Sequence, residues 1–115
     1  MPEIKKRIVC AITMGDPSGI GAEIIIKALR RYDVKRLARF VIIGDSRALH
    51  KGLADKRVSK GVNLVDLKNM PRKKISFGKV RAEYGKASIE YLDEALKLVR
   101  SKDVNCLVTA PVCKK

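Results

Sequence analysis

The sequence has few of the residues from which several common kinds of site are built. It contains one histidine, His50, no tryptophan, and three cysteines, Cys10, Cys106 and Cys113, which form no CxxC pair. A single histidine does not make a metal site by itself, and His50 lies in a polar, helix-like stretch where a surface position is expected. Cys10 and Cys106 lie in apolar runs, where free cysteine behaves as a small hydrophobic residue. We therefore expect buried thiols in a reducing compartment, and neither disulfides nor zinc.

Long apolar runs are also absent. No run approaches the ~20 apolar residues that a membrane-spanning helix needs. The amino-terminal stretch is basic and then briefly apolar, but it lacks a convincing apolar core with a small-residue cleavage site. We therefore expect a cytoplasmic protein that makes no contact with a membrane.

Acidic residues are scarce, with 12 against 26 lysines and arginines, so the formal net charge is +14. This charge fits a nucleic-acid-binding module, an enzyme for phosphorylated substrates, or a solvated surface whose acidic counterpart lies elsewhere. The basic clusters are spread along the chain, and no aromatic residues interleave with them as stacking platforms. Nucleic-acid binding therefore stays an alternative from a different functional class.

What the sequence does contain is a regular alternation of strand-like and helix-like segments. Short apolar runs bounded by glycine, proline or polar residues predict buried strands, and amphipathic segments predict helices. The predicted strands are residues 7–14, 39–43, 63–67 and 105–109, and the predicted helices are residues 20–31, 46–53 and 81–102. Ser46 is the expected N-cap of the second helix. The alternation predicts an α/β fold with a mostly parallel sheet and flanking helices.

The last predicted helix carries the longest periodic pattern. Its apolar residues follow a 3-4-3 spacing, which predicts one apolar face; they are Ile89, Leu92, Leu96 and Val99. Gly85 and Ser88 in the same helix are expected to be small because another element packs closely there. The chain ends six residues after the last predicted strand, where the alternation requires a further helix. We therefore expect residues 1–115 to be a single incomplete α/β domain, the N-terminal portion of a longer protein.

The most unusual segment is TMGDPSGIGAE, residues 13–23, which joins the first predicted strand to the first predicted helix. Its glycines permit special backbone angles or the close approach of a ligand. Either Asp16, followed by Pro17, or Ser18 fits the N-cap of the helix. The free N–H groups of a helix start also suit an anion.

The spacing matches neither G-x-G-x-x-G nor the P-loop, so the pattern by itself favours a structural turn. The position of the segment favours a ligand-binding site, because ligands of open α/β sheets bind at the carboxyl ends of the strands. Asp16, Asp45 and Lys114 all follow predicted strands and can face one crevice.

Four segments resemble, in order, the 4-hydroxythreonine-4-phosphate dehydrogenase family of vitamin B6 biosynthesis. They are ITMGDPSGIGAEIIIKAL, VIIGD, the helix with G-K-A-S, and LVTAPVCKK. That family opens with a GDPAGIGPE-like motif, carries IGD after its second strand and has a later TAP-x-x-K motif. The opening is more loosely similar to the GDGIGPE of isopropylmalate and isocitrate dehydrogenases, whose fold the family shares. Ala22 stands where the family usually has proline, and Cys113 where asparagine or histidine is common.

The resemblance implies the N-terminal part of an isopropylmalate dehydrogenase-like fold in a two-domain, homodimeric enzyme. Such an enzyme oxidises a small phosphorylated hydroxy acid with NAD or NADP and a divalent metal (Zn, Mg or Co), and the 3-oxo acid then loses carbon dioxide. The family's GHTE-like motif and metal-binding histidines lie beyond residue 115. This chain is therefore expected to hold no metal and to be inactive alone. A four-carbon acid phosphate, phosphothreonate or phosphoerythronate, is the alternative substrate.

Matching the family's motifs residue by residue assigns six residues to a substrate and cofactor cleft: Gly15, Asp16, Gly19, Gly21, Thr109 and Lys114. A turn without ligand contact is the alternative for the first four. An aspartate at a helix start repels phosphate, so Asp16 is expected to cap the helix or to meet a cation or hydroxyl. Lys114 is expected to pair with a carboxylate or phosphate of the substrate, unless it is a surface lysine. Asp45, in the IGD motif, is expected to cap the following helix.

Overall fold

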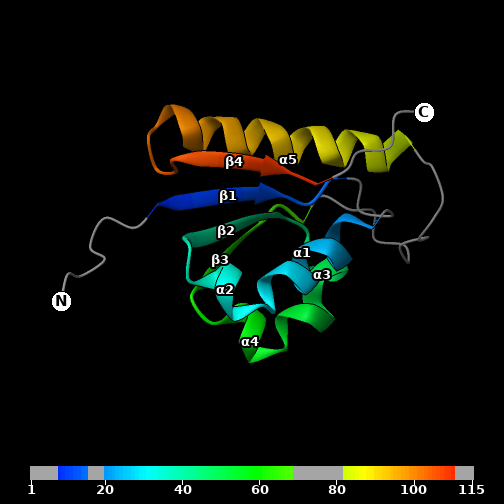
Figure 1. The fold of residues 1–115 in the computed structure, drawn as a ribbon. Coiled ribbons are helices and arrows are strands. Elements are labelled where there is room, and N and C mark those ends of the chain that lie inside the picture. Colours follow the sequence, from blue (N-terminus) through cyan, green and yellow to red (C-terminus); the bar gives the residue numbers. More distant parts are fainter. Residues whose placement is uncertain (1–7, 16–19, 69–81, 111–115) are drawn as a thin grey trace.

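The computed structural model describes residues 8–15, 20–68 and 82–110, which form one sheet between two layers of helix (Figure 1). The strands are β1 (Val9–Thr13), β2 (Arg39–Gly44), β3 (Val62–Asp66) and β4 (Cys106–Thr109). All of them pair in parallel, in the order β3-β2-β1-β4. The predicted α/β fold with a parallel sheet is confirmed.

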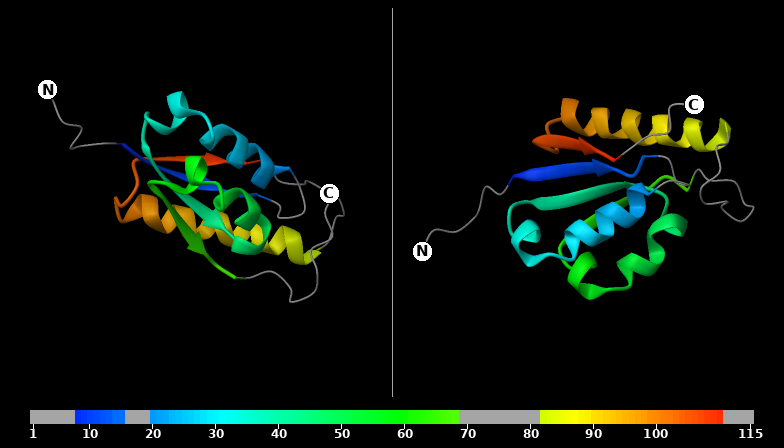
Figure 2. Two further views of the ribbon diagram at one scale, coloured as in Figure 1. Left: turned by 90° about the horizontal axis from the view of Figure 1, so that it is seen from below. Right: turned by 45° about the vertical axis from the view of Figure 1, so that its right-hand side comes forward.

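The two faces of the sheet carry different helices. Four helices cover one face, namely α1 (Gly21–Leu29), α2 (Tyr32–Lys35), α3 (Ser46–Leu53) and α4 (Lys56–Ser59), and α5 (Ala82–Arg100) lies on the other (Figures 1 and 2). The sequence predicted α1, α3 and α5 to within about two residues at each end. It missed α2 and α4, which have four residues each and are too short to show a helical period.

The order of the strands follows from the handedness of the crossovers. The connections from β1 to β2 and from β2 to β3 step outward in one direction, so right-handed crossovers leave their helices on the same face. The connection from β3 returns past β1 to β4, and α5 therefore crosses the opposite face (Figure 2). The direction of winding reverses between β1 and β4, and this reversal is a topological switch point.

The core lies on both faces of the two central strands, β1 and β2. Ile42, Ile43 and Ala11 are fully buried, because parallel strands covered on both sides have no solvent-facing side. Leu29 of α1 and Leu49 of α3 complete the packing on the face with four helices. On the other face the buried residues of α5 are Ala87, Ser88, Tyr91 and Ala95.

The predicted apolar face of α5 is not the one that packs on the sheet. Ile89, Leu92, Leu96 and Val99 are 37–61% exposed. The small residues Ala87, Ser88 and Ala95 lie inward instead, together with Tyr91, the largest fully buried side chain among the described residues. Close packing at Ser88 is confirmed, since this residue is buried. Among the described residues the prediction is wrong at Gly85, because beyond its chain neighbours and the backbone of its own helix nothing lies within 4 Å of where a Cβ would stand.

The two described cysteines sit side by side on neighbouring strands, since Cys10 pairs in register with Cys106. Cys10 is buried as predicted, and burial, followed by the neighbouring Cys106, raises the pKa of its thiol to about 12. Cys106 is exposed, so its predicted burial is wrong. The reason is that β4 is an edge strand on which Val108 is also 51% exposed. Cys113 lies outside the described residues.

Candidate functional site

The carboxyl ends of the strands are aligned along one edge of the sheet. Backbone hydrogen bonds continue the ladder past the strands: Ala110 donates to the Thr13 carbonyl at 3.0 Å, and Met14 to the Ile43 carbonyl at 3.0 Å. The switch point between β1 and β4 lies on this edge, and in open α/β sheets it is where ligands bind. The residues that follow β1 and β4 are therefore the first candidates for a binding site.

Gly21 shows how tightly the switch point is built. It is the first residue of α1, and a Cβ at this position would collide with the Met14 carbonyl oxygen and approach the Ala110 Cβ to 3.0 Å. Helix α1 therefore begins directly against the ends of both β1 and β4. Gly21 lies where it was predicted, but its missing side chain serves packing between these elements. In this position it is a structural residue of the candidate site.

Three of the six predicted cleft residues lie together at the switch point. Gly15 follows β1 with a φ of 78°, a left-handed conformation that favours glycine. Thr109 is the exposed last residue of β4, and Gly21 touches both strand ends. The other three, Asp16, Gly19 and Lys114, lie outside the described residues.

Ile20 precedes α1 at the N-cap position, and its apolar side chain provides no capping hydrogen bond. The proposed caps, Asp16 and Ser18, both lie outside the described part of the chain. The N–H groups of the first turn therefore have no side-chain cap among the described residues, and Glu23 is the acidic residue of that turn. The helix start can attract an anion, although Glu23 weakens this attraction.

Asp45, at the end of β2, caps α3 as predicted. Its side chain is 1% exposed, and its Oδ1 accepts a hydrogen bond from the Arg47 backbone N–H at 2.9 Å. The Arg47 guanidinium also pairs with this carboxylate, with Nη2 3.2 Å from Oδ2. Ser46 was the other predicted cap, but it is the first residue of α3. The cap is thus Asp45, and its buried carboxylate is paired with Arg47 of the helix that it caps.

Asp66 and Tyr91 form a polar cluster with Asp45 that the sequence analysis missed. The Asp66 Oδ1 accepts hydrogen bonds from the backbone N–H groups of Ser46, at 3.2 Å, and Lys68, at 3.1 Å. Tyr91 reaches the interior from α5, and its buried hydroxyl has no hydrogen-bond partner among the described residues. Burial raises the pKa of Tyr91, and the charges of Asp45 and Asp66 raise it further. The phenol therefore stays protonated at neutral pH and can donate a hydrogen bond.

One feature of the sequence does point to Asp66. It ends β3 as Asp45 ends β2, so the two aspartates occupy equivalent places on adjacent parallel strands. Tyr91 gave no such signal, because an aromatic residue in an amphipathic helix usually belongs to the core.

A divalent metal does not fit the described residues. Among them no group of three histidine, cysteine or acidic side chains could hold a metal ion. Asp45 and Asp66 already accept hydrogen bonds from backbone N–H groups, those of Arg47 in α3 and of Lys68 after β3. None of the helices in the described ranges is long and apolar enough to cross a bilayer.

Comparison with known proteins gives a consistent match. The family model of the pyridoxal phosphate biosynthetic protein PdxA matches residues 11–115. A 4-hydroxythreonine-4-phosphate dehydrogenase from Sulfurihydrogenibium sp. is 37% identical over 91% of the chain and 36% of its own length. A relative from Fusobacterium nucleatum, provisionally named a D-threonate 4-phosphate dehydrogenase, is 30% identical over 95% of the chain and 38% of its own length.

Solved structures agree with the sequence relatives. The 4-hydroxythreonine-4-phosphate dehydrogenase of Burkholderia phymatum superposes with a TM-score of 0.82 and 28% identity over 96% of the chain. That of Klebsiella pneumoniae superposes with a TM-score of 0.78 and 26% identity over 95% of the chain. In both cases the match covers 38% of the solved chain. The chain thus spans little more than a third of the length of the relatives it matches.

Proposed function

The chain belongs to the family of the pyridoxal phosphate biosynthetic protein PdxA, and from this premise we propose that it forms the N-terminal portion of an NAD(P)-dependent dehydrogenase for a phosphorylated hydroxy acid. The observation that carries the proposal is the superposition on a 4-hydroxythreonine-4-phosphate dehydrogenase with a TM-score of 0.82 over 96% of the chain. Relatives of this chain are named dehydrogenases, which supports an oxidoreductase.

The proposed reaction removes a hydride from the hydroxyl-bearing carbon and a proton from its oxygen. A bound nicotinamide cofactor supplies the hydride acceptor. The 3-oxo acid that results then loses carbon dioxide. In this reaction the role of the chain is to form one wall of the cleft, where Gly15 and Thr109 lie beside the start of α1. Small residues and a helix start suit an anionic, phosphorylated molecule.

We propose that the chain is inactive alone, because it spans little more than a third of the length of the relatives that it matches. The catalytic groups then belong to the remainder of a two-domain, homodimeric and cytoplasmic enzyme. Lys114 is proposed to bind a phosphate or carboxylate of the substrate.

The nucleotide sequence beyond codon 115 provides the most direct test. An open frame that continues into a GHTE-like motif and two separated histidines would support the proposal. The protein encoded by that frame should then reduce NAD or NADP with 4-hydroxythreonine 4-phosphate, and residues 1–115 alone should not. A stop codon with no complementing downstream frame would refute an enzymatic role for this gene product, and turnover by residues 1–115 alone would refute the proposed inactivity.

D-Threonate 4-phosphate is the second candidate substrate, because the Fusobacterium nucleatum relative carries that name and matches 95% of the chain. The two substrates differ at the amino-bearing carbon, where 4-hydroxythreonine phosphate has nitrogen and the threonate has oxygen. The ratio of kcat/KM for the two compounds, measured on the complete protein with each cofactor, discriminates between them.

A further inference from the structure

A strongly basic pocket lies at the opposite edge of the sheet from the switch point. It has a volume of about 850 Å³ and is formed at the amino ends of β2 and β3 with the ends of α1, α2 and α4. Of the described residues that line it, seven are lysine or arginine and none is acidic. Its volume falls within the range of about 300–1,000 Å³ that is usual for small-molecule sites.

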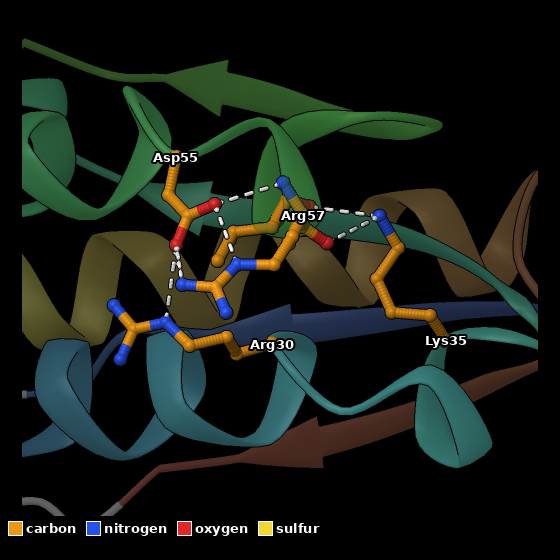
Figure 3. Close-up of polar contacts among 5 residues, drawn as sticks. Arg30, Lys35, Asp55 and Arg57 are labelled. Carbon is orange, nitrogen blue, oxygen red and sulfur yellow. Dashed lines mark hydrogen bonds and ion pairs between the residues drawn. The ribbon is translucent and has the colours of Figure 1, made fainter.

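Three of the seven cations are engaged in holding α4 in place (Figure 3). Asp55, the N-cap of α4, receives hydrogen bonds from Arg57 Nη2 at 2.9 Å and from Arg30 Nε at 3.2 Å. At the other end of α4, the Lys35 ammonium donates to the carbonyls of Arg57 and Val58, at 3.2 and 3.0 Å, and to that of Lys60. An ammonium has three donors, so Lys35 is fully used by the protein.

Hydrogen-bond donors remain available in the pocket. Arg30 contacts Asp55 only through Nε, so its two terminal nitrogens have no partner among the described residues. The remaining four cations of the pocket have no acidic partner in the described part of the chain; they are Arg36, Arg39, Lys56 and Lys60. Among the described residues, Asp55 is thus the one acidic group bound to the pocket's cations, and the pocket keeps an excess of positive charge.

The positive charge of the pocket changes the pKa of one of its own side chains. The pKa of Lys35 is lowered, first by burial and then by the positive charge of Lys60. Like charges gathered in a concave surface produce a positive potential that concentrates anions. An anion of several charges would relieve this repulsion, whereas one carboxylate would offset only a small part of it.

We propose that this pocket binds an oligophosphate, the triphosphate of a nucleotide or an inorganic polyphosphate chain. Arginine presents planar N–H groups that fit phosphate oxygens in pairs, and several arginines in one pocket suit successive phosphate groups. Tyr32, which is 80% exposed on the pocket wall, is placed to stack on a nucleobase. The site is separate from the switch point, because β2 runs five residue steps, about 16 Å, from Arg39 at the pocket to Gly44 at the other edge.

Isothermal titration of the complete gene product with tripolyphosphate and with ATP tests the proposal. Saturable binding of one ligand per chain is expected, and it should weaken as salt rises. The pair Arg39→Gln and Lys60→Gln should lower the affinity about tenfold or more, since each removes a charged contact to phosphate. The pair Lys97→Gln and Arg100→Gln is the matched control, because it removes the same charge from α5 on the other face.

The outcomes separate the ligand sources. Tighter binding of ATP than of tripolyphosphate, lost in Tyr32→Ala, assigns the site to nucleotides, and equal binding assigns it to polyphosphate. Absence of saturable binding, or equal weakening in the control pair, overturns the proposal. So does a single-stranded oligonucleotide that competes with both ligands and binds several chains, which would assign the surface to nucleic acid. If Arg39→Gln prevents folding, as judged by circular dichroism, the pair Arg36→Gln and Lys56→Gln takes the place of the first pair of variants. None of these results depends on dehydrogenase activity.

Discussion

Gly21 and Gly85 are both helical glycines, but their surroundings are opposite. A Cβ at Gly21 would collide with the Met14 carbonyl oxygen, whereas one at Gly85 would meet no described atom within 4 Å. Gly21→Ala should therefore lower the free energy of unfolding by ~1–3 kcal/mol or more, the usual cost of overpacking, because the backbone must move. Gly85→Ala should stabilise it by about 0.5–1 kcal/mol through helix propensity. Urea unfolding of both variants measures the difference.

A neutral Gly21→Ala would show that α1 does not begin against the strand ends. A destabilising Gly85→Ala would show that something packs on Gly85, as the sequence analysis expected. Sequence reasoning could locate Gly21 by its motif, but not the reason for it. One part of the reason is the contact with Ala110, which lies 89 positions away in the chain and approaches only through the pairing of β1 with β4.

The short helix α4 depends on the charge of Asp55. The pKa of this carboxyl is lowered from 3.8 to about 2, chiefly by hydrogen bonds from Arg57 and also by Arg30. Because the folded-state pKa lies below the unfolded value, the unfolded chain binds the proton first as the pH falls. The stabilisation by Asp55 is therefore complete above about pH 4 and lost between about pH 4 and pH 2.

Asp55→Asn tests whether the charge of Asp55 stabilises α4, since asparagine keeps a capping oxygen but not the charge. Its stability should fall below that of the unchanged chain at pH 6 and approach it near pH 2, as measured by thermal unfolding. Asp93→Asn, on the outer side of α5, is the control for the loss of one carboxylate. A stability difference that stays constant from pH 6 to pH 2 would contradict the assigned role.

The helix α5 marks how far a sequence pattern predicts an element. Its length was predicted because its periodicity extends over many residues, but its orientation was not. The spacing of Ile89, Leu92, Leu96 and Val99 identifies one apolar face, and Ala87, Tyr91 and Ala95 form a second face with nearly the same period. Two adjacent faces thus fit one helix, and hydrophobicity favours the face of isoleucine, leucine and valine. In the structure the sheet packs against the other face, which holds two alanines and a tyrosine.

For the molecule as a whole, the alternation of strands and helices predicted the connectivity and the parallel sheet. The strand order β3-β2-β1-β4 did not follow from it, since handedness permits β4 to lie on either side of the sheet. The candidate site depends on that order, which brings the loop after β1 beside the end of β4. Motif resemblance supplied this juxtaposition indirectly, by assigning Gly15 and Thr109 to one cleft.

The exposed apolar surface leads to a prediction about the isolated chain. Several large apolar side chains are exposed to water. They are Ile89, Leu92, Leu96 and Val99 on α5, and Val108 on the edge strand β4. Exposed apolar side chains of this size bind hydrophobic dyes and favour association when they gather in a patch. The net charge of +14 opposes association at low salt, so association should increase as added salt screens the repulsion. Leu92→Gln with Leu96→Gln should reduce both dye fluorescence and the sedimentation-derived mass, whereas Lys86→Gln with Lys97→Gln on the same helix should reduce neither. A monomer that binds no dye at any salt concentration would show that this face is covered within residues 1–115.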